Sequence, residues 1–473
     1  SFLNLAAWDS TQFSAIAPAA IPSLDLFTIT SQLSGLTSTQ VSKLSTTALF
    51  TLDETQYAAL STTALGGLSS AQVNALGAIA FGEQNSTQLN ALSANAVAGI
   101  NGSQIFFLET NSTGVLAGLD AAKISRLNTD AVGSLTSDQL NALSTTQVQA
   151  FTASQIGAIS AFDLGSLSTT SLTSLSVAQL AGVTSTQLPS LTSTQVGALA
   201  STQLNALTTA ALKTLTADQA SAISSTELSG LAVTRIGALS TLAVTALTTT
   251  ALTGLSSTQA LGLTSSQVAS LSTDQIASLS TDQLNKLTTA AVAGLNATLT
   301  ASLTTTQVGG LATTVLSALS TASVAALDET QIATLNTSQI QSLKTAQLNA
   351  LTATTLGGLT TTELDGLTTT QVAGLSVAQL ANFDTTNIAN LETTQLKGLT
   401  AAQLGSFTTD QLGALTTDQL NSLTATALGA LKTTQVTGLT TTQLSGLDST
   451  HLQALSVAVV HSLDFGQVDS LTS

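Results

Sequence analysis

An aliphatic residue returns at every eighth position along most of this chain. From Leu119 to Leu471, each first position of the octad is Leu, Ile, Val or Phe. In the octad that begins at Leu271, position 2 is Ser, position 5 Gln, position 6 Ile and position 8 Ser. In the other octads, position 2 is mostly Thr or Ser and position 5 is often Gln. Position 6 is mostly aliphatic, and position 8 is mostly Ala, Gly or Ser. A repeat at this short interval predicts one small structural unit stacked many times.

The polar positions predict that each octad is a short α-helix. Ser or Thr at position 2 and Gln at position 5 have the spacing of a capping box, as in Thr192/Gln195 and Ser280/Gln283. Asp274, at position 4, falls in the first turn, where the helix dipole favours negative charge. Position 6 and position 1 of the next octad are three residues apart, as are residues on one face of a helix. We therefore predict an all-α repeat solenoid with one helix per octad; a β-solenoid is the alternative, because the chain is rich in Thr, Val and Ile.

Such helices need neighbours to persist. Isolated helices shorter than about 12 residues are marginal in water. The aliphatic positions 1 and 6 are therefore expected to form a core shared between coils, and the small residue at position 8 to let coils approach closely. The pattern does not fix how many octads make one coil.

Shifts of the octad register divide the chain into four segments. Residues 1–35 hold the only Trp and two of the three Pro, and we interpret them as an N-terminal cap or docking segment. Residues 36–108 are an octad block with one polar lapse at Gln84. Residues 109–118 are expected to be a short insertion loop, and residues 119–473 a second octad block with an uncapped end.

The two ends of the chain are the candidate self-assembly surfaces. Soluble solenoids usually carry polar caps at both ends. Here the N-terminal segment carries bulky aromatic residues, and the last octads keep the aliphatic pattern. The candidate residues are Phe2, Trp8, Phe13, Phe465, Val468 and Leu471.

Composition restricts the partners. Charged residues are only 7% of the chain, and 9 Lys and Arg stand against 25 Asp and Glu, giving a net charge of −16. Nucleic-acid binding rests on neutralising phosphates, so it is not expected. No apolar run is long enough to predict a membrane span, and no signal peptide is visible. The chain has no Cys and no Met, an economy typical of abundant exported proteins.

The sequence offers little chemistry. There are two His residues, and His461 falls at position 7, which we expect to face solvent. The acidic pairs Asp53/Glu54 and Asp328/Glu329 lie at cap and first-turn positions, so capping explains them better than acid–base catalysis. We predict no catalytic residues, no cofactor and no metal site, and we expect that the protein is not an enzyme.

The octads resemble low-complexity Leu-Thr-Thr-x-Gln-Val-x-Ala arrays of bacterial exported and surface proteins. The resemblance covers nearly the whole chain and implies an extracellular or cell-surface location, without bringing functional residues. The segment from Leu191 to Val196 is also similar to the start of transcription activator-like effector repeats. That likeness stops after six residues, and the base-reading pair and the basic surface are missing, so DNA binding does not follow.

Three functions fit these observations. The first is a structural protein that assembles head to tail with itself into an extracellular fibre, a surface layer or a biofilm matrix. The second is a stalk or adhesive module of a larger surface protein, with the cell surface or glycans as partners. The third is ice or surface binding by the ranked Thr residues of positions 2 and 3.

Overall fold

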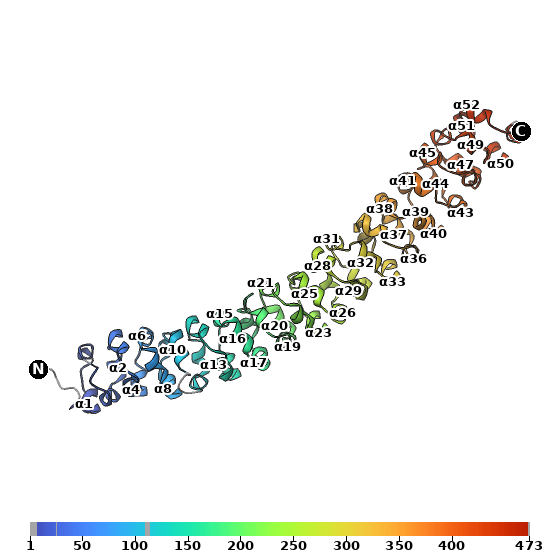
Figure 1. Cartoon of the computed structure of the whole chain (residues 1–473). Helices are drawn as coiled ribbons and strands as arrows, with labels where there is room; N and C mark the ends of the chain where they lie inside the picture. The colour runs from blue at the N-terminus through green and yellow to red at the C-terminus, as the bar shows by residue number, and fades with distance from the viewer. Residues whose placement is uncertain (1–6, 25, 109–113, 472–473) are drawn as a thin grey trace. The chain divides into compact units, whose positions relative to one another are not determined.

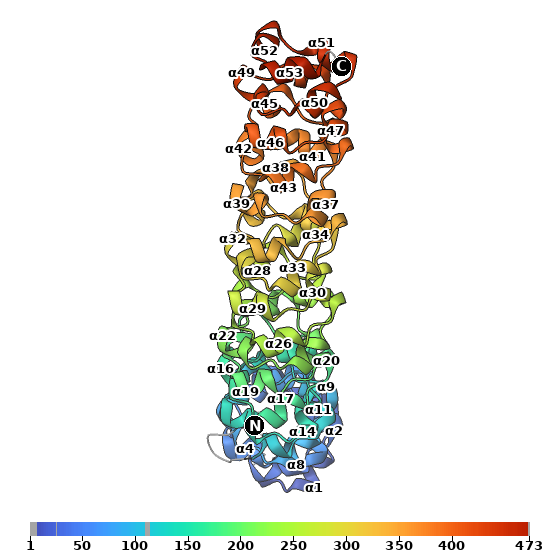
Figure 2. The same ribbon diagram turned by 90° about the vertical axis from the view of Figure 1, so that its right-hand side faces the viewer.

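A computed structural model describes residues 7–24, 26–108 and 114–471. The chain divides into two compact units, Ser1–Leu247 and Thr248–Ser473, and each is described by itself. All regular elements in the described ranges are short: α-helices of four to six residues, with a few 3-10 turns and no strand. The prediction of an all-α repeat solenoid is confirmed, and the β-solenoid alternative is wrong. In each unit the helices follow one another in chain order (Figures 1 and 2).

The capping box starts most of these helices as predicted. In helix α30 (Thr281–Asn285) the N-cap Ser280 has extended backbone, and its hydroxyl accepts from the Gln283 N–H at 3.2 Å. The Gln283 Oε1 in turn accepts from the Ser280 N–H at 2.6 Å. Two of the N–H groups that every helix start leaves without a partner are thereby satisfied. The helix ends after five residues, and Leu287 begins the next octad.

Three octads make one coil of the solenoid. In the first unit, α19 (Ser193–Gly197) packs on α22 (Ala217–Ser221), the third helix after it. In the second unit, α26 (Thr249–Thr253) packs on α29 (Thr273–Ser278) in the same way. Each helix therefore lies between the corresponding helices of the coil before and the coil after. The pattern of the sequence did not reveal this number.

The core is built from positions 1 and 6, as expected. Ile276 and Leu284 at position 6 are fully buried, and Leu279 at position 1 is nearly so. Gln283 at position 5 is buried as well, which the sequence did not predict. A buried primary amide needs hydrogen-bond partners for its donors as well as its acceptor.

The partners of the buried Gln lie in the preceding coil. The Gln283 Nε2 donates to the Leu252 carbonyl at 3.0 Å and to the Leu255 carbonyl at 2.6 Å. These carbonyls stand at the end of an earlier helix, where the helix leaves its last carbonyls without an internal partner. The first unit repeats the arrangement at Gln155, whose Nε2 donates to the Ile124 and Leu127 carbonyls at 2.8 and 2.6 Å. One Gln side chain thus caps its own helix and fastens it to the coil before.

Some octads carry a second polar bridge on the surface. Asn285, at position 7, donates from Nδ2 to the Gly310 carbonyl at 2.8 Å, and its Oδ1 accepts from the Ala312 N–H at 2.6 Å. Asn349 makes the same pair of bonds to the Gly374 carbonyl and the Ser376 N–H. These bridges run toward the following coil, opposite in direction to the Gln bridges.

Position 3 differs from expectation. A ranked Thr array that binds ice requires this position to face solvent, but Thr417 is only partly exposed in α47 (Thr417–Ser422). It lies against Gly446 of the next coil: a methyl group on Gly446 would come within 2.3 Å of Thr417 Cγ2. Close contact between coils at the small position 8 residue therefore extends to position 3. Thr417 belongs to the stacking interface rather than to a free face.

The N-terminal segment is helical too. It contains α1 (Ser10–Ser14), the 3-10 turn η2 (Pro18–Ser23) and the 3-10 turn η3 (Ser31–Gly35). Phe13 is fully buried, and the half-buried Trp8 packs edge-on against it with ring centres 6.0 Å apart. This segment forms the first coil, and α1 packs on η3.

Candidate functional surfaces

The described residues hold no group of three or more His, Cys, Asp or Glu side chains arranged to bind a metal ion. In these same ranges, no helix combines the length and the apolar character that crossing a membrane requires. Two kinds of surface depart from the regular solenoid. One is the end face of the last coil, and the other is a groove on the side of the first unit.

The last described coil exposes side chains whose counterparts one coil earlier are buried. It consists of α51 (Ser449–Ala454), α52 (Val457–His461) and α53 (Phe465–Ser470). Val460 and Val468 occupy position 6 and are 44% and 46% exposed. The residues one coil earlier at these positions, Val436 and Leu444, are fully buried. The predicted candidates Leu471 and Phe465 are also exposed, at 37% and 89%.

The first coil presents a different face. Of the candidates predicted there, Phe13 lies in the core, Trp8 is half-buried, and Phe2 lies outside the described residues. Gln12, at position 5 of its octad, forms the usual capping box with Asp9, at 2.9 and 2.8 Å. Unlike Gln283 it is exposed, and its Nε2 has no acceptor among the described residues. The position 5 amide, which donates to the preceding coil in other octads, is therefore exposed at Gln12.

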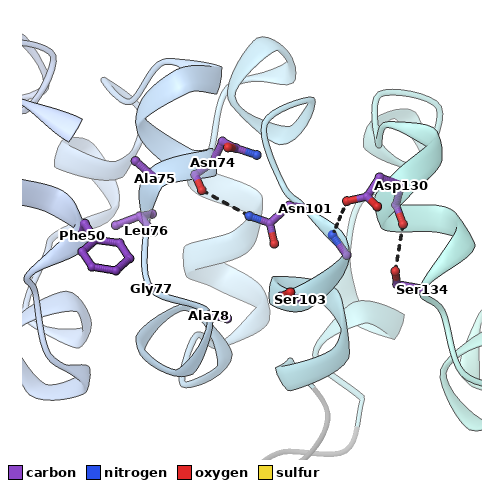
Figure 3. Close-up of a pocket in the computed structure, with 11 residues that line it drawn as sticks. Phe50, Asn74, Ala75, Leu76, Gly77, Ala78, Asn101, Ser103, Asp130 and Ser134 are labelled. Atoms are coloured by element: carbon purple, nitrogen blue, oxygen red, sulfur yellow. Dashed lines mark hydrogen bonds between the residues drawn. The ribbon is translucent and has the colours of Figure 1, made fainter. Parts of the chain in front are cut away.

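A groove on the first unit consists of two adjoining hollows, of about 730 and 400 Å³. The larger hollow lies along Phe50, Ile79 and Phe107, beside Asp53 and Glu54. The smaller one is lined by polar residues at one end, among them Asn101, Asp130 and Ser134, and Phe50 and residues 77–78 line both hollows. Figure 3 shows Phe50 at one end of the smaller hollow and the polar side chains at the other. The groove is therefore apolar at one end and polar at the other.

Hydrogen bonds between coils fix the polar end of the groove. The Asn101 Nδ2 donates to the Asn74 carbonyl at 3.2 Å, and the Asp130 Oδ2 accepts from the Gly102 N–H at 2.8 Å (Figure 3). Within one coil, the Ser134 hydroxyl donates to the Asp130 carbonyl at 3.0 Å. We did not predict this groove. The available signal was a break in the octad, because Gly77 and Ala80 stand where Ser or Thr and Gln are usual.

One octad in the second unit carries Glu where the bridging Gln belongs. Glu363 is buried, and its Oε2 accepts from the Thr360 N–H at 2.6 Å and the Thr360 hydroxyl at 2.8 Å. Its Oε1 has no hydrogen-bond partner among the described residues. A carboxylate keeps the capping function of Gln but has no N–H to donate to the preceding coil.

Replacing this residue by the usual amide should stabilise the protein. We expect Glu363→Gln to raise the free energy of unfolding by about 1–2 kcal/mol, because it supplies two donors at a buried site that now lacks a partner. Chemical denaturation followed by circular dichroism measures the change. Glu227→Gln is the matched control, since Glu227 also occupies position 5 but is half-exposed. An equal gain in both variants would contradict the assigned role of position 5.

His451 replaces Gln in the last coil and is buried. Its Nε2 lies 2.8 Å from the Leu423 carbonyl, and its Nδ1 lies 2.8 Å from the Asp448 Oδ1. Burial alone lowers the pKa of His451, but the hydrogen bonds to Leu423 and to Asp448, with the charge of Asp448, raise it above its ordinary value. The His451 N–H and ring hold the pKa of Asp448 below its usual range. The imidazolium fits this place best, because both ring nitrogens face acceptors.

The last coils should therefore be more stable in mild acid than in base. A raised folded-state pKa gives a contribution that is complete below the ordinary His value, near about 6.5, and is lost as the pH rises through the folded value. The lowered pKa of Asp448 acts in the opposite sense and is lost only in stronger acid. Hydrogen exchange of α51 at about pH 5.5 and about pH 8 measures the effect. We expect faster opening at the higher pH, and His451→Gln should remove the difference; a difference that persists in the variant would contradict this assignment.

The comparisons with known proteins agree with a repeat architecture. Residues 261–289 and 388–425 match a model of the ALTTAQ repeat. No curated protein matches the chain. Fold and matched segments together define a helical repeat protein with a solenoid architecture.

Proposed function

We propose that this chain is a non-enzymatic structural repeat protein that assembles end to end into an extracellular fibre, surface layer or matrix. The observation that carries the proposal is that like coils stack through buried aliphatic side chains and Gln amides, as at Leu284 and Gln283. In the coil of α51, α52 and α53, the side chains that would make this kind of contact, Val460 and Val468, are nearly half-exposed, whereas the same positions one coil earlier are fully buried. A surface of this kind fits another coil of the same solenoid.

The first coil supplies a matching face. The Gln12 Nε2 points outward without an acceptor among the described residues, where Gln in later coils donates to the coil before. A second copy stacked on the last coil would therefore find both an apolar contact and a donor for helix-end carbonyls. Contacts between two different faces that do not close by rotation give open filaments.

Composition supports the same proposal. Charged residues are 7% of the chain, so the net charge of −16 is spread over many octads and opposes stacking only weakly. The absence of Cys and Met and the resemblance to exported repeat arrays support an extracellular or cell-surface location. Ice binding is not proposed, because many position 2 hydroxyls cap helices and Thr417 at position 3 lies against the next coil.

Electron microscopy of the purified chain at increasing concentration tests the proposal. We expect filaments that lengthen with concentration, and Val468→Asp should abolish them, because it places a charge in the stacking face. The control is Val377→Asp, an apolar position of similar exposure (43%) in an earlier coil of the second unit. Monodisperse particles of the unaltered chain at all concentrations would exclude end-to-end assembly.

The groove on the first unit favours a second candidate, an adhesive or stalk module of a larger surface protein. Exposed apolar side chains beside polar ones are typical of surfaces that hold a partner. In that case the octads would act as a spacer, and the chain would bind cells or surfaces without forming filaments. Cell-binding assays with the unaltered chain and with the Val468→Asp variant separate the two roles.

A further inference from the structure

We propose that the groove on the first unit binds an extended peptide segment of a partner protein that carries an apolar anchor next to a basic residue. The proposal does not depend on end-to-end assembly. It rests on three departures from the octad pattern that meet at this groove, and on the charges that line it.

The first departure is a pair of apolar side chains at surface positions. Phe50, at position 7, is 68% exposed, and Ile79, at position 4, is 55% exposed. Elsewhere these positions mostly carry small or polar residues, such as Asn285 and Asp282 in the octad of α30. Both side chains line the same hollow. A pair of exposed apolar groups at one groove is the feature expected of an anchor site.

The second departure is Gly77, the N-cap of α7 (Ala78–Gly82). It makes no side-chain cap hydrogen bond, unlike most N-cap residues of this chain. Its backbone is an ordinary one with φ of −58°, and the nearest atom to an added methyl group would be the Phe50 carbonyl oxygen, 3.9 Å away. The fold therefore does not require glycine here. What glycine provides is an open groove wall, because residue 77 lines both hollows.

The third departure is Ala80, which replaces the bridging Gln at position 5. Helix α7 thus lacks both halves of the capping box. Its position is maintained by packing between α4 (Glu54–Ala58) and α10 (Gly102–Phe107). A functional surface is expected where residues depart from the repeat pattern although the fold does not require the departure.

The charges of the groove select the occupant. Asp53 and Glu54 lie beside the apolar hollow, and Asp130 lines the polar one. All three are exposed, and no Lys, Arg or His is found among the described residues that line either hollow. Asp53 caps α4 and Asp130 accepts from Gly102, and neither forms an ion pair among the described residues. A basic side chain next to an apolar one is the complement of this surface.

The shape of the groove favours a peptide over a small molecule. A site for a small ligand encloses most of the ligand surface. Here Phe50, Ile79, Asp53 and Glu54 are all exposed, so the groove is shallow. Its two hollows adjoin through Phe50 and residues 77–78, which gives room for consecutive side chains.

Fluorescence anisotropy with the purified full chain tests the proposal. The probe is a labelled five-residue peptide that alternates Lys with Phe, and the same peptide with Glu in place of Lys is its counterpart. We expect only the Lys peptide to bind, and added salt to weaken binding. Phenethylammonium, the small-molecule arm, should compete only at much higher concentration. Equal binding of the two peptides, or equal potency of phenethylammonium, would overturn the proposal.

Variants of the groove separate binding from folding. Gly77→Ser restores the cap and narrows the groove, so it should raise the melting temperature while weakening binding about tenfold or more. Phe50→Ala should weaken binding similarly. Phe162→Ala is the control, because Phe162 is exposed on the same unit but does not line this groove. Peptide binding that survives both groove variants would show general attraction to an acidic chain and would overturn the assignment.

Discussion

Leu319→Asp is expected to lower the free energy of unfolding by about 3–5 kcal/mol. Leu319 occupies position 1 between α34 (Thr313–Ala318) and α35 (Thr321–Ala325) and is buried. The substitution removes apolar contacts shared by successive coils, and it places a carboxylate at a buried core position. Urea denaturation followed by circular dichroism measures the loss.

The matched control introduces the same residue three positions later. Ala322 is exposed at position 4, in the first turn of α35. Ala322→Asp should be neutral or slightly stabilising, since a negative charge near a helix start is favourable and Asp282 already occupies this position in α30. Equal losses in the two variants would contradict the assignment of buried and exposed faces.

Gly67→Ala is expected to destabilise the first unit by about 1–3 kcal/mol or more. A methyl group on Gly67 would lie 2.0 Å from the Ser38 carbonyl oxygen of the preceding coil, so the two coils would have to separate. Because the obstructing atom belongs to the backbone, a side-chain rotation cannot relieve the clash. Thermal unfolding and hydrogen exchange of the first coils measure the effect.

The neighbouring glycine provides the comparison. At Gly66 the nearest atom to an added methyl group is the Ala91 carbonyl oxygen at 3.4 Å, an ordinary contact, and the backbone is helical. Gly66→Ala should therefore be neutral, or stabilising by a few tenths of a kcal/mol, because Ala restricts the unfolded chain. If Gly66→Ala lowered the stability as much as Gly67→Ala does, the small residue at position 8 would not be what sets the spacing between coils.

The helices and the core could be predicted because both depend on neighbours in the sequence. Ser280 and Gln283 form a capping box at a spacing of three residues, and Leu279 and Leu284 are buried at positions 1 and 6 as the apolar pattern required. The small residue at position 8 was also interpreted correctly. These features need no knowledge of how one coil meets the next.

The number of octads in a coil could not be predicted, because it depends on the angle between successive helices. That angle is set by the extended backbone at each N-cap, such as φ −71° and ψ 157° at Ser280. The burial of Gln283 was missed for a related reason, since its second set of partners lies 28 and 31 residues away. A signal was present: Gln recurs at position 5 even though Ser or Thr alone caps a short helix, as Thr248 does for α26.

The groove was missed because its residues belong to different coils. Phe50, Ile79 and Asp130 are well separated in the sequence and meet only when coils stack. Gly77 and Ala80 were the local signs, because they stand where the capping Ser or Thr and the bridging Gln are usual.

Hydrogen exchange of the Gln side-chain amides, measured by nuclear magnetic resonance on the folded chain, tests the central claim most directly. We infer that the amide of a position 5 Gln joins its helix to the coil before, as the Nε2 of Gln283 does with Leu252 and Leu255. We therefore expect most Gln Nε2 protons to exchange slowly, while the exposed Gln12 exchanges quickly. Uniformly fast exchange, at the rate of free amides in water, would contradict the bridged solenoid.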